Sequence, residues 1–217
     1  MEATTLFTLS FLFLFFTTNY GVYASRGISI LDKEPPAVLD LNGNELQKGE
    51  YYYLLPSIAL PFLYTAAIIP GIYRPGTTWL QLEIEVFTYG IKGLPVTFSP
   101  TNLNEDASIH VSTYLNIKYS NELPPVFGES PVWKVLEGFE PFVTLGGAEE
   151  DRSSWFKIEK ASEIDNRTYK LVSSFGRDVG ISNRVYGTKR LALADEALSF
   201  SFLPAKDGLN FKMKHLK

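Results

Sequence analysis

Beyond residue 37 the chain consists of short runs of aliphatic, β-branched and aromatic residues, and no stretch has the apolar spacing of a long amphipathic helix. Turn-forming residues separate these runs, for example Gly146-Gly147, Asp165-Asn166 and Gly187-Thr188. Many short strands with frequent turns are typical of a β-barrel or a β-sandwich. The sequence therefore predicts an all-β fold, with strands in the runs 51–55, 79–87, 94–98, 109–119, 132–135, 142–145, 155–158, 169–172, 179–181, 190–193 and 198–203, and one further strand between 57 and 76.

The run from Trp79 to Phe87 alternates most clearly between apolar and polar residues. Its apolar face carries Leu80, Leu82, Ile84 and Val86. Glu83 and Glu85 share the other face, so we expect a half-buried strand with both glutamates in solvent. Two carboxylates on one face could also act as an acid/base pair. Because no histidine stands beside them, we interpret this face as a solvent-exposed strand face.

The first 24 residues have a different character from the rest. Leu6 to Phe16 is an almost unbroken apolar run, and small residues precede Ser25. This pattern is typical of a secretory signal peptide cleaved after Ala24, and the run is too short for a transmembrane helix. We expect the chain to be exported, to the cell exterior or the vacuole, and not to associate with a membrane afterwards. Residues 25–36 are expected to form a flexible lead-in, and residues 206–217 a basic tail.

Composition excludes several classes of function. The chain has no cysteine, so disulfides, thiolate metal ligands and cysteine nucleophiles are ruled out. Its two histidines, His110 and His215, stand in neither a metal-ligand cluster nor a nucleophile elbow, and we predict no metal, no cofactor and no hydrolase activity. A formal charge of −4 argues against a nucleic acid partner. Asn166 begins an Asn-Arg-Thr glycosylation sequon in a predicted turn.

The stretch from Val38 to Pro56 carries the most specific pattern in the chain. Asn42-Gly43-Asn44 suits a tight turn, Lys48-Gly49 suits a second one, and the run after it reads as a strand that Pro56 ends. The stretch resembles the N-terminal signature of the plant Kunitz-type (soybean trypsin inhibitor) family, whose slots are filled here by Val38, Asp40, Asn42, Gly43, Asn44, Leu46, Tyr52 and Leu54. Later segments resemble its miraculin-like branch, at 94–100, 111–119, 132–135, 143–147, 153–159, 169–172, 178–181 and 190–193.

The resemblance implies a β-trefoil of twelve short strands over residues 37–205, with pseudo-threefold symmetry, acting as a monomer and not as an enzyme. Family members usually carry four cysteines in two disulfides. The corresponding places here look like Arg74, a residue near Pro124, Ser174 and Gly176, so both disulfides are absent.

The resemblance also implies a substrate-like loop that blocks a secreted or digestive protease. That contact segment would begin with a Ser-Pro element and comprise Ser99, Pro100, Thr101, Asn102, Leu103, Asn104, Glu105 and Asp106. The family register puts Asn102 at the primary specificity position, and a shift of one residue would put Leu103 there. Neither is the Lys or Arg that the acidic pocket of trypsin requires, whereas Leu103 suits a serine protease with an apolar pocket.

Lys48 stands where inhibitory relatives often use an Asn to hold the loop, and its side chain has no acceptor for that purpose. The alternative is therefore a plant defence, storage or ligand-binding trefoil that no longer inhibits a protease.

Overall fold

The computed structural model describes residues 34–58, 64–71, 81–88, 93–102, 107–120, 129–138, 141–182 and 189–207. Contacts divide the chain into residues 1–34 and 35–217, and the second unit holds nearly all the described residues. The expected signal peptide, most of the expected lead-in and the tail beyond Asp207 lie outside the described residues.

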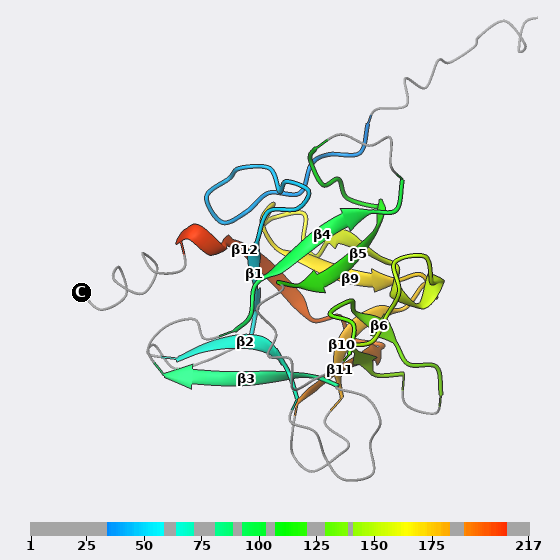
Figure 1. The fold of residues 1–217 in the computed structure, drawn as a ribbon. Helices are drawn as coiled ribbons and strands as arrows, with labels where there is room; N and C mark the ends of the chain where they lie inside the picture. Colours follow the sequence, from blue (N-terminus) through cyan, green and yellow to red (C-terminus); the bar gives the residue numbers. More distant parts are fainter. Residues whose placement is uncertain are drawn as a thin grey trace, which may run out of the picture. The chain divides into compact units, whose positions relative to one another are not determined.

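Six of the described strands close into an antiparallel barrel (Figure 1). They are β1 (Tyr52–Pro56), β4 (Val96–Pro100), β5 (Tyr114–Tyr119), β8 (Phe156–Lys160), β9 (Tyr169–Ser173) and β12 (Ser199–Pro204). Each strand pairs with the next in this order, and β12 pairs with both β9 and β1. A closed ring of this kind leaves no open strand edge in the barrel.

The other six labelled strands form three hairpins, which cover one end of the barrel. They are β2 (Tyr64–Pro70) with β3 (Leu82–Thr88), β6 (Lys134–Val135) with β7 (Val143–Thr144), and β10 (Asp178–Ser182) with β11 (Arg190–Ala194). One β-bridge joins each pair of hairpins. The three bridges pair Glu83 with Arg190, Gln81 with Thr144, and Phe142 with Ala192. The cap is therefore a triangle of hairpins.

This arrangement repeats a four-strand unit three times, which is the β-trefoil that the resemblance implied. In every unit the first and fourth strands belong to the barrel and the middle two to the cap. Equivalent positions carry buried apolar pairs facing each other across the barrel strands, Leu54 with Phe202, Phe98 with Ile117, and Ile158 with Leu171. These positions share only hydrophobicity and size, so the repeat is not visible in the residue letters.

The core lies inside the barrel and beneath the cap. Barrel strands alternate between buried and half-buried residues, as β1 and β9 show most regularly. The ring centroids of Phe98 and Tyr169 both lie 5.5 Å from that of Phe202, a spacing at which aromatic rings attract one another. Trp133 is fully buried, as expected of a core residue.

The structure corrects three expectations for the strands. The run 109–119 is not one strand, because residues 109–113 make only bridges and turns and β5 begins at Tyr114. Val86 shares the alternation of buried Leu82 and Ile84 but is 41% exposed. Glu83 is not on a solvated face, because it forms an ion pair with the buried Arg190, whereas Glu85 is exposed.

Helical structure in the described residues includes two single 3-10 turns, η2 (Arg152–Ser154) and η3 (Ala205–Asp207). Within the described part of the chain, no helix has the length and apolar character needed to span a membrane.

Candidate functional site

The expected contact loop connects β4 to β5 at the barrel end away from the cap hairpins. Ser99 and Pro100 are not loop residues, because they end β4 and pair with Asn116 and Leu115 of β5. Thr101 and exposed Asn102 leave the barrel, and the chain is described again from Ala107. The remaining loop residues of the sequence prediction, which are Leu103, Asn104, Glu105 and Asp106, lie outside the described residues.

The N-terminal stem of the loop is fixed to the start of β5. The backbone N–H of Thr101 donates to the carbonyl of Tyr114 at 2.9 Å, and its hydroxyl donates to the same oxygen at 3.2 Å. Pro100, which precedes it, is buried and has a fixed φ. These contacts therefore fix the direction in which the chain leaves the barrel at Thr101.

The C-terminal stem is fixed to the opening segment of the domain. The Lys48 N–H donates to the carbonyl of Ala107 at 2.7 Å, and the Ile109 N–H donates to that of Leu46 at 2.8 Å. Side chains add to this contact, since the Gln47 amide donates to the Ser108 hydroxyl at 3.1 Å and that hydroxyl donates to a Glu45 carboxylate oxygen at 2.6 Å. Both stems of the loop are therefore hydrogen-bonded to the trefoil.

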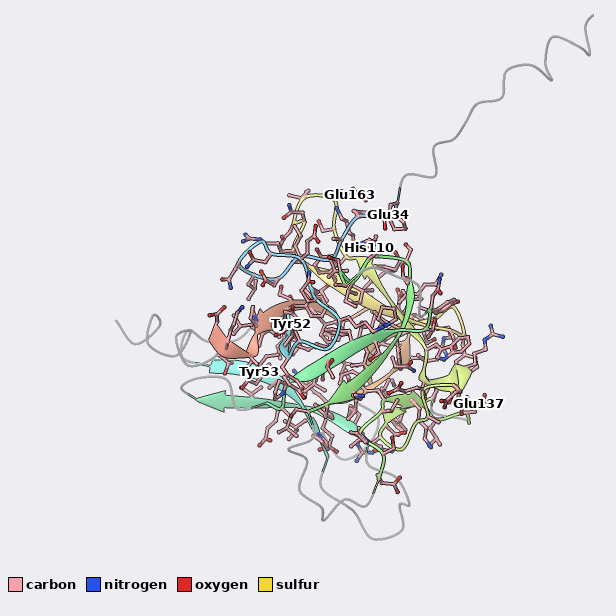
Figure 2. All side chains as sticks on the ribbon, turned by 45° about the horizontal axis from the view of Figure 1, so that its top comes forward. Glu34, Tyr52, Tyr53, His110, Glu137 and Glu163 are labelled. Carbon is pink, nitrogen blue, oxygen red and sulfur yellow. The ribbon has the colours of Figure 1, made fainter. Side chains whose placement is uncertain are left out.

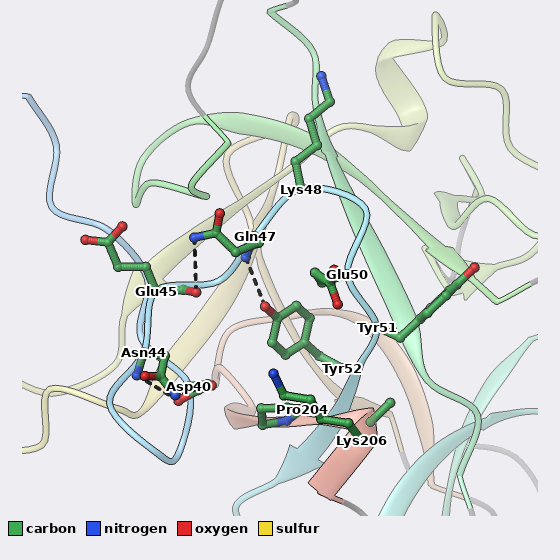
Figure 3. A pocket seen from close by; sticks show the side chains of 11 residues that line it. Asp40, Asn44, Glu45, Gln47, Lys48, Glu50, Tyr51, Tyr52, Pro204 and Lys206 are labelled. Carbon is green, nitrogen blue, oxygen red and sulfur yellow. Dashed lines mark hydrogen bonds between the residues drawn. The ribbon is translucent and has the colours of Figure 1, made fainter.

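Lys48 supports the loop with its backbone. Its side chain is exposed and extends away from the pocket residues drawn around it (Figure 3). Gly49, which follows, has φ +80° and donates its N–H to the carbonyl of Phe98. Reasoning from the Lys48 side chain alone misses this backbone support. The Lys48-Gly49 turn predicted from the sequence marks where it occurs.

The Asp-x-Asn-Gly-Asn pattern of the opening turn has a local structural role. Asp40 is 2% exposed, and its Oδ1 accepts the N–H groups of Asn42 and Asn44 at 2.8 and 2.9 Å. Gly43 between them has φ +85°, which an L residue rarely adopts. The Asp-x-Asn-Gly-Asn order therefore builds a turn closed by a buried carboxylate, from which the segment runs to the loop stem.

A pocket of about 670 Å³ lies between this turn and η3 (Figure 3). Its lining includes Asp40, Glu50, Tyr52 and Lys206. The Tyr52 hydroxyl accepts the Gln47 N–H at 3.0 Å, and burial, with the nearby carboxylates of Asp40 and Glu50, raises the pKa of this phenol although that hydrogen bond lowers it.

Asn166, the predicted glycosylation site, is exposed in the turn between β8 and β9. The Thr168 hydroxyl and the Arg167 N–H both donate to the Asp165 carboxylate, which lowers the pKa of Asp165. This turn lies at the same end of the barrel as the β4–β5 connection, as Glu163 of the turn and His110 of the connection show in Figure 2.

Two of the four places of the missing cysteines are described. The Ser174 hydroxyl donates to the carbonyl of Arg152 at 2.7 Å, and the Arg152 guanidinium donates back to the carbonyl of Ser174 at 3.2 Å. Gly176 has φ +76°. Hydrogen bonds thus link the β9–β10 turn to η2. Arg74 and Pro124 lie outside the described residues. No cluster of three or more metal-ligating side chains occurs among the residues described.

Comparisons with known proteins agree with this architecture. Miraculin of Synsepalum dulcificum is 32% identical over 225 residues, which cover 93% of this chain and 97% of that protein. Among solved structures, the water-soluble chlorophyll protein of Brassica oleracea var. Botrytis with chlorophyll b matches at a TM-score of 0.66 and 27% identity, covering 78% of this chain and 98% of that one. Trypsin inhibitor from soybean matches at a TM-score of 0.61 and 25% identity, with coverages of 78% and 98%. The model of the Kunitz legume family, described as trypsin and protease inhibitor, matches residues 38–203, so the chain belongs to the plant Kunitz family.

Proposed function

We propose that this protein inhibits a serine protease with an apolar specificity pocket by presenting the segment from Thr101 to Asp106 as a substrate-like loop. The observation that carries the proposal is the attachment of both stems, Thr101 to Tyr114 on one side and Ala107 to Lys48 on the other. A loop whose ends are already ordered loses less conformational freedom on binding, so more of the contact energy becomes affinity. Family membership supports the same mechanism.

The loop sequence sets the expected target. Residues 99–106 contain no Lys or Arg to pair with the buried carboxylate of a trypsin-like pocket. Leu103 would fill an apolar pocket of the chymotrypsin or subtilisin kind. We therefore propose that trypsin is not the main target, and that the protein acts by occupying the protease without catalysing a reaction of its own.

We also propose that the protein is exported and glycosylated at Asn166. The apolar run near the N-terminus and the exposure of Asn166 support this. Expression in a eukaryotic secretory host should give a protein whose electrophoretic mobility increases after treatment with an N-glycosidase. The Asn166→Gln variant should not respond to that treatment.

Titration of the purified protein against chymotrypsin, subtilisin, trypsin and a papain-like protease tests the proposed inhibition. We expect tight inhibition of chymotrypsin or subtilisin, lost in Leu103→Gly. Ile164→Gly is the matched control, because Ile164 is 99% exposed on the β8–β9 connection and its truncation removes an aliphatic side chain from a different loop. Equal losses in the two variants, or no inhibition by a folded protein, would contradict the proposal.

The second candidate is a non-inhibitory defence, storage or ligand-binding trefoil. Similarity to the water-soluble chlorophyll protein favours the ligand-binding form. Mixing the protein with chlorophyll b and measuring pigment absorbance in the soluble fraction after gel filtration tests it. Co-elution of pigment without protease inhibition would support this candidate over the first.

A further inference from the structure

Ser112 has an unusual backbone conformation. Its φ is +62°, and among the described residues it is the only non-glycine with a positive φ. L residues other than Asn and Asp rarely adopt this conformation, and it persists only where the surroundings hold it in place. Ser112 lies in the β4–β5 connection, between the C-terminal stem of the loop and the first residue of β5.

Two hydrogen bonds to β8 hold Ser112 in this conformation. Its backbone N–H donates to the carbonyl of Ile158 at 3.0 Å, and its hydroxyl donates to a carboxylate oxygen of Glu159 at 2.9 Å. Both acceptors belong to the fourth strand of the second repeat. The conformation is therefore maintained by contacts from outside the loop.

The stem before Ser112 is held along the opening segment of the domain. The carbonyl of Ile109 accepts the Val38 N–H at 2.8 Å, and the Val111 N–H donates to the carbonyl of Pro36 at 3.0 Å. Thr113 then leads into β5, which begins at Tyr114. Ser112 is thus the corner at which the stem, held by the first repeat, meets a strand held by the second.

We propose that Ser112 is a positioning residue for the contact loop, with its left-handed backbone and its bond to Glu159 fixing the direction of the C-terminal stem. The inference rests on the proposed function in that the loop it positions is the proposed inhibitory one. A corner that relaxed to negative φ would redirect the stem and release the bonds to Lys48 and Leu46. The loop would then be cleaved as a substrate where it should resist cleavage.

The test compares Ser112→Val and Ser112→Gly with the wild-type protein. Valine disfavours positive φ and lacks the hydroxyl that donates to Glu159. Glycine adopts positive φ freely but also lacks that hydroxyl. Gly176→Val is the matched control: Gly176 has φ +76° with open space around an added Cβ, so it takes the same backbone strain at the cap end of the barrel. Thermal midpoints of all variants are measured, and assays are run well below them.

The first measurement is the inhibition constant for the protease blocked in the titration above. Ser112→Val should raise it at least tenfold and Ser112→Gly less, while Gly176→Val leaves it unchanged. The second measurement is the rate at which thermolysin cleaves within residues 102–107, read by mass spectrometry. Here too Ser112→Val should be cleaved fastest.

The two measurements separate the failure of each idea. If the wild type inhibits no protease, the proposed function fails, and the cleavage rates still decide the role of Ser112. If Ser112→Val matches Gly176→Val in cleavage rate, and in inhibition where inhibition exists, the positioning role is overturned.

Discussion

The ion pair between Arg190 and Glu83 should be a major contributor to the stability of the cap. Their side chains are 6% and 14% exposed, with Nε 3.3 Å from Oε1. The guanidinium carbon also lies 5.8 Å from the centroid of the Phe142 ring. Arg190 of β11 therefore contacts residues of both other hairpin regions of the triangle.

Replacing Arg190 with Met keeps most of the length of the side chain and removes its charge. Glu83 then remains in a poorly hydrated site without the guanidinium. Removing one partner of a buried pair costs about 3–5 kcal/mol. For a domain of this size, each kcal/mol lowers the thermal midpoint by roughly 2–4 °C, so a fall of roughly 6–20 °C is expected.

Urea unfolding followed by tryptophan fluorescence measures this loss. Lys118→Met is the matched control, because the ion pair of Lys118 with Glu149 has the same 3.3 Å separation but is 35% and 47% exposed. Its removal should cost less than about 1 kcal/mol. The double variant Arg190→Met/Glu83→Leu should recover much of the lost stability, because no carboxylate is then left in the site.

Two outcomes would refute this reasoning. If Arg190→Met loses no more unfolding free energy than Lys118→Met, burial does not increase the contribution of an ion pair to stability. A double variant as unstable as Arg190→Met would show that the loss comes from packing and not from the carboxylate left behind.

Three further predictions concern the loop, a cap strand and a buried phenol. Asn102→Lys should confer trypsin inhibition if Asn102 is the primary specificity residue, and Leu103→Lys should do so if the register is shifted by one; trypsin inhibition assays decide, and no gain in either variant would argue against the loop. Gly180→Ala should cost about 1–3 kcal/mol because the added Cβ would collide with the backbone carbonyl oxygen of Glu196, and an unchanged urea midpoint would contradict this. Burial raises the pKa of Tyr119 well above its ordinary value of 10.0, so the folded state keeps the proton that the unfolded state loses and stability should fall as pH rises above 10. Tyr119→Phe should lose about 1 kcal/mol of unfolding free energy at pH 7, but its stability should decline less than that of the wild type between pH 9 and 11 in urea unfolding. Equal declines would count against a raised pKa of Tyr119.

Alternation along the chain predicted the fold class and most strand positions, because barrel residues such as Leu54 and Leu171 face the core in strict period two. It could not place Glu83, whose partner Arg190 comes from another repeat. It also joined residues 109–113 to β5, because β-branched and aromatic residues surround Ser112 and nothing in a serine marks a left-handed backbone.

The sequence located the connection that would carry the candidate site. The Ser-Pro element located the β4–β5 connection, although Ser99 and Pro100 belong to the strand. The hydrogen bond from Lys48 to Ala107 could not be anticipated from residue type, because any non-proline residue can supply a backbone N–H. In the sequence, only Gly49 indicates the turn that brings the Lys48 N–H to the carbonyl of Ala107.

Closure of the barrel by β12 also bears on when the protein can fold. β12 pairs with all five residues of β1, from Tyr52 opposite Pro204 to Pro56 opposite Phe200, and it pairs with β9 as well. During synthesis, β1 and β9 therefore keep exposed backbone edges until the last strand has left the ribosome. Pairings between residues so far apart in the chain are slow to form. We expect the nascent chain to need protection from aggregation late in synthesis, and a chain shortened before Ser199 to be retained by chaperones and degraded.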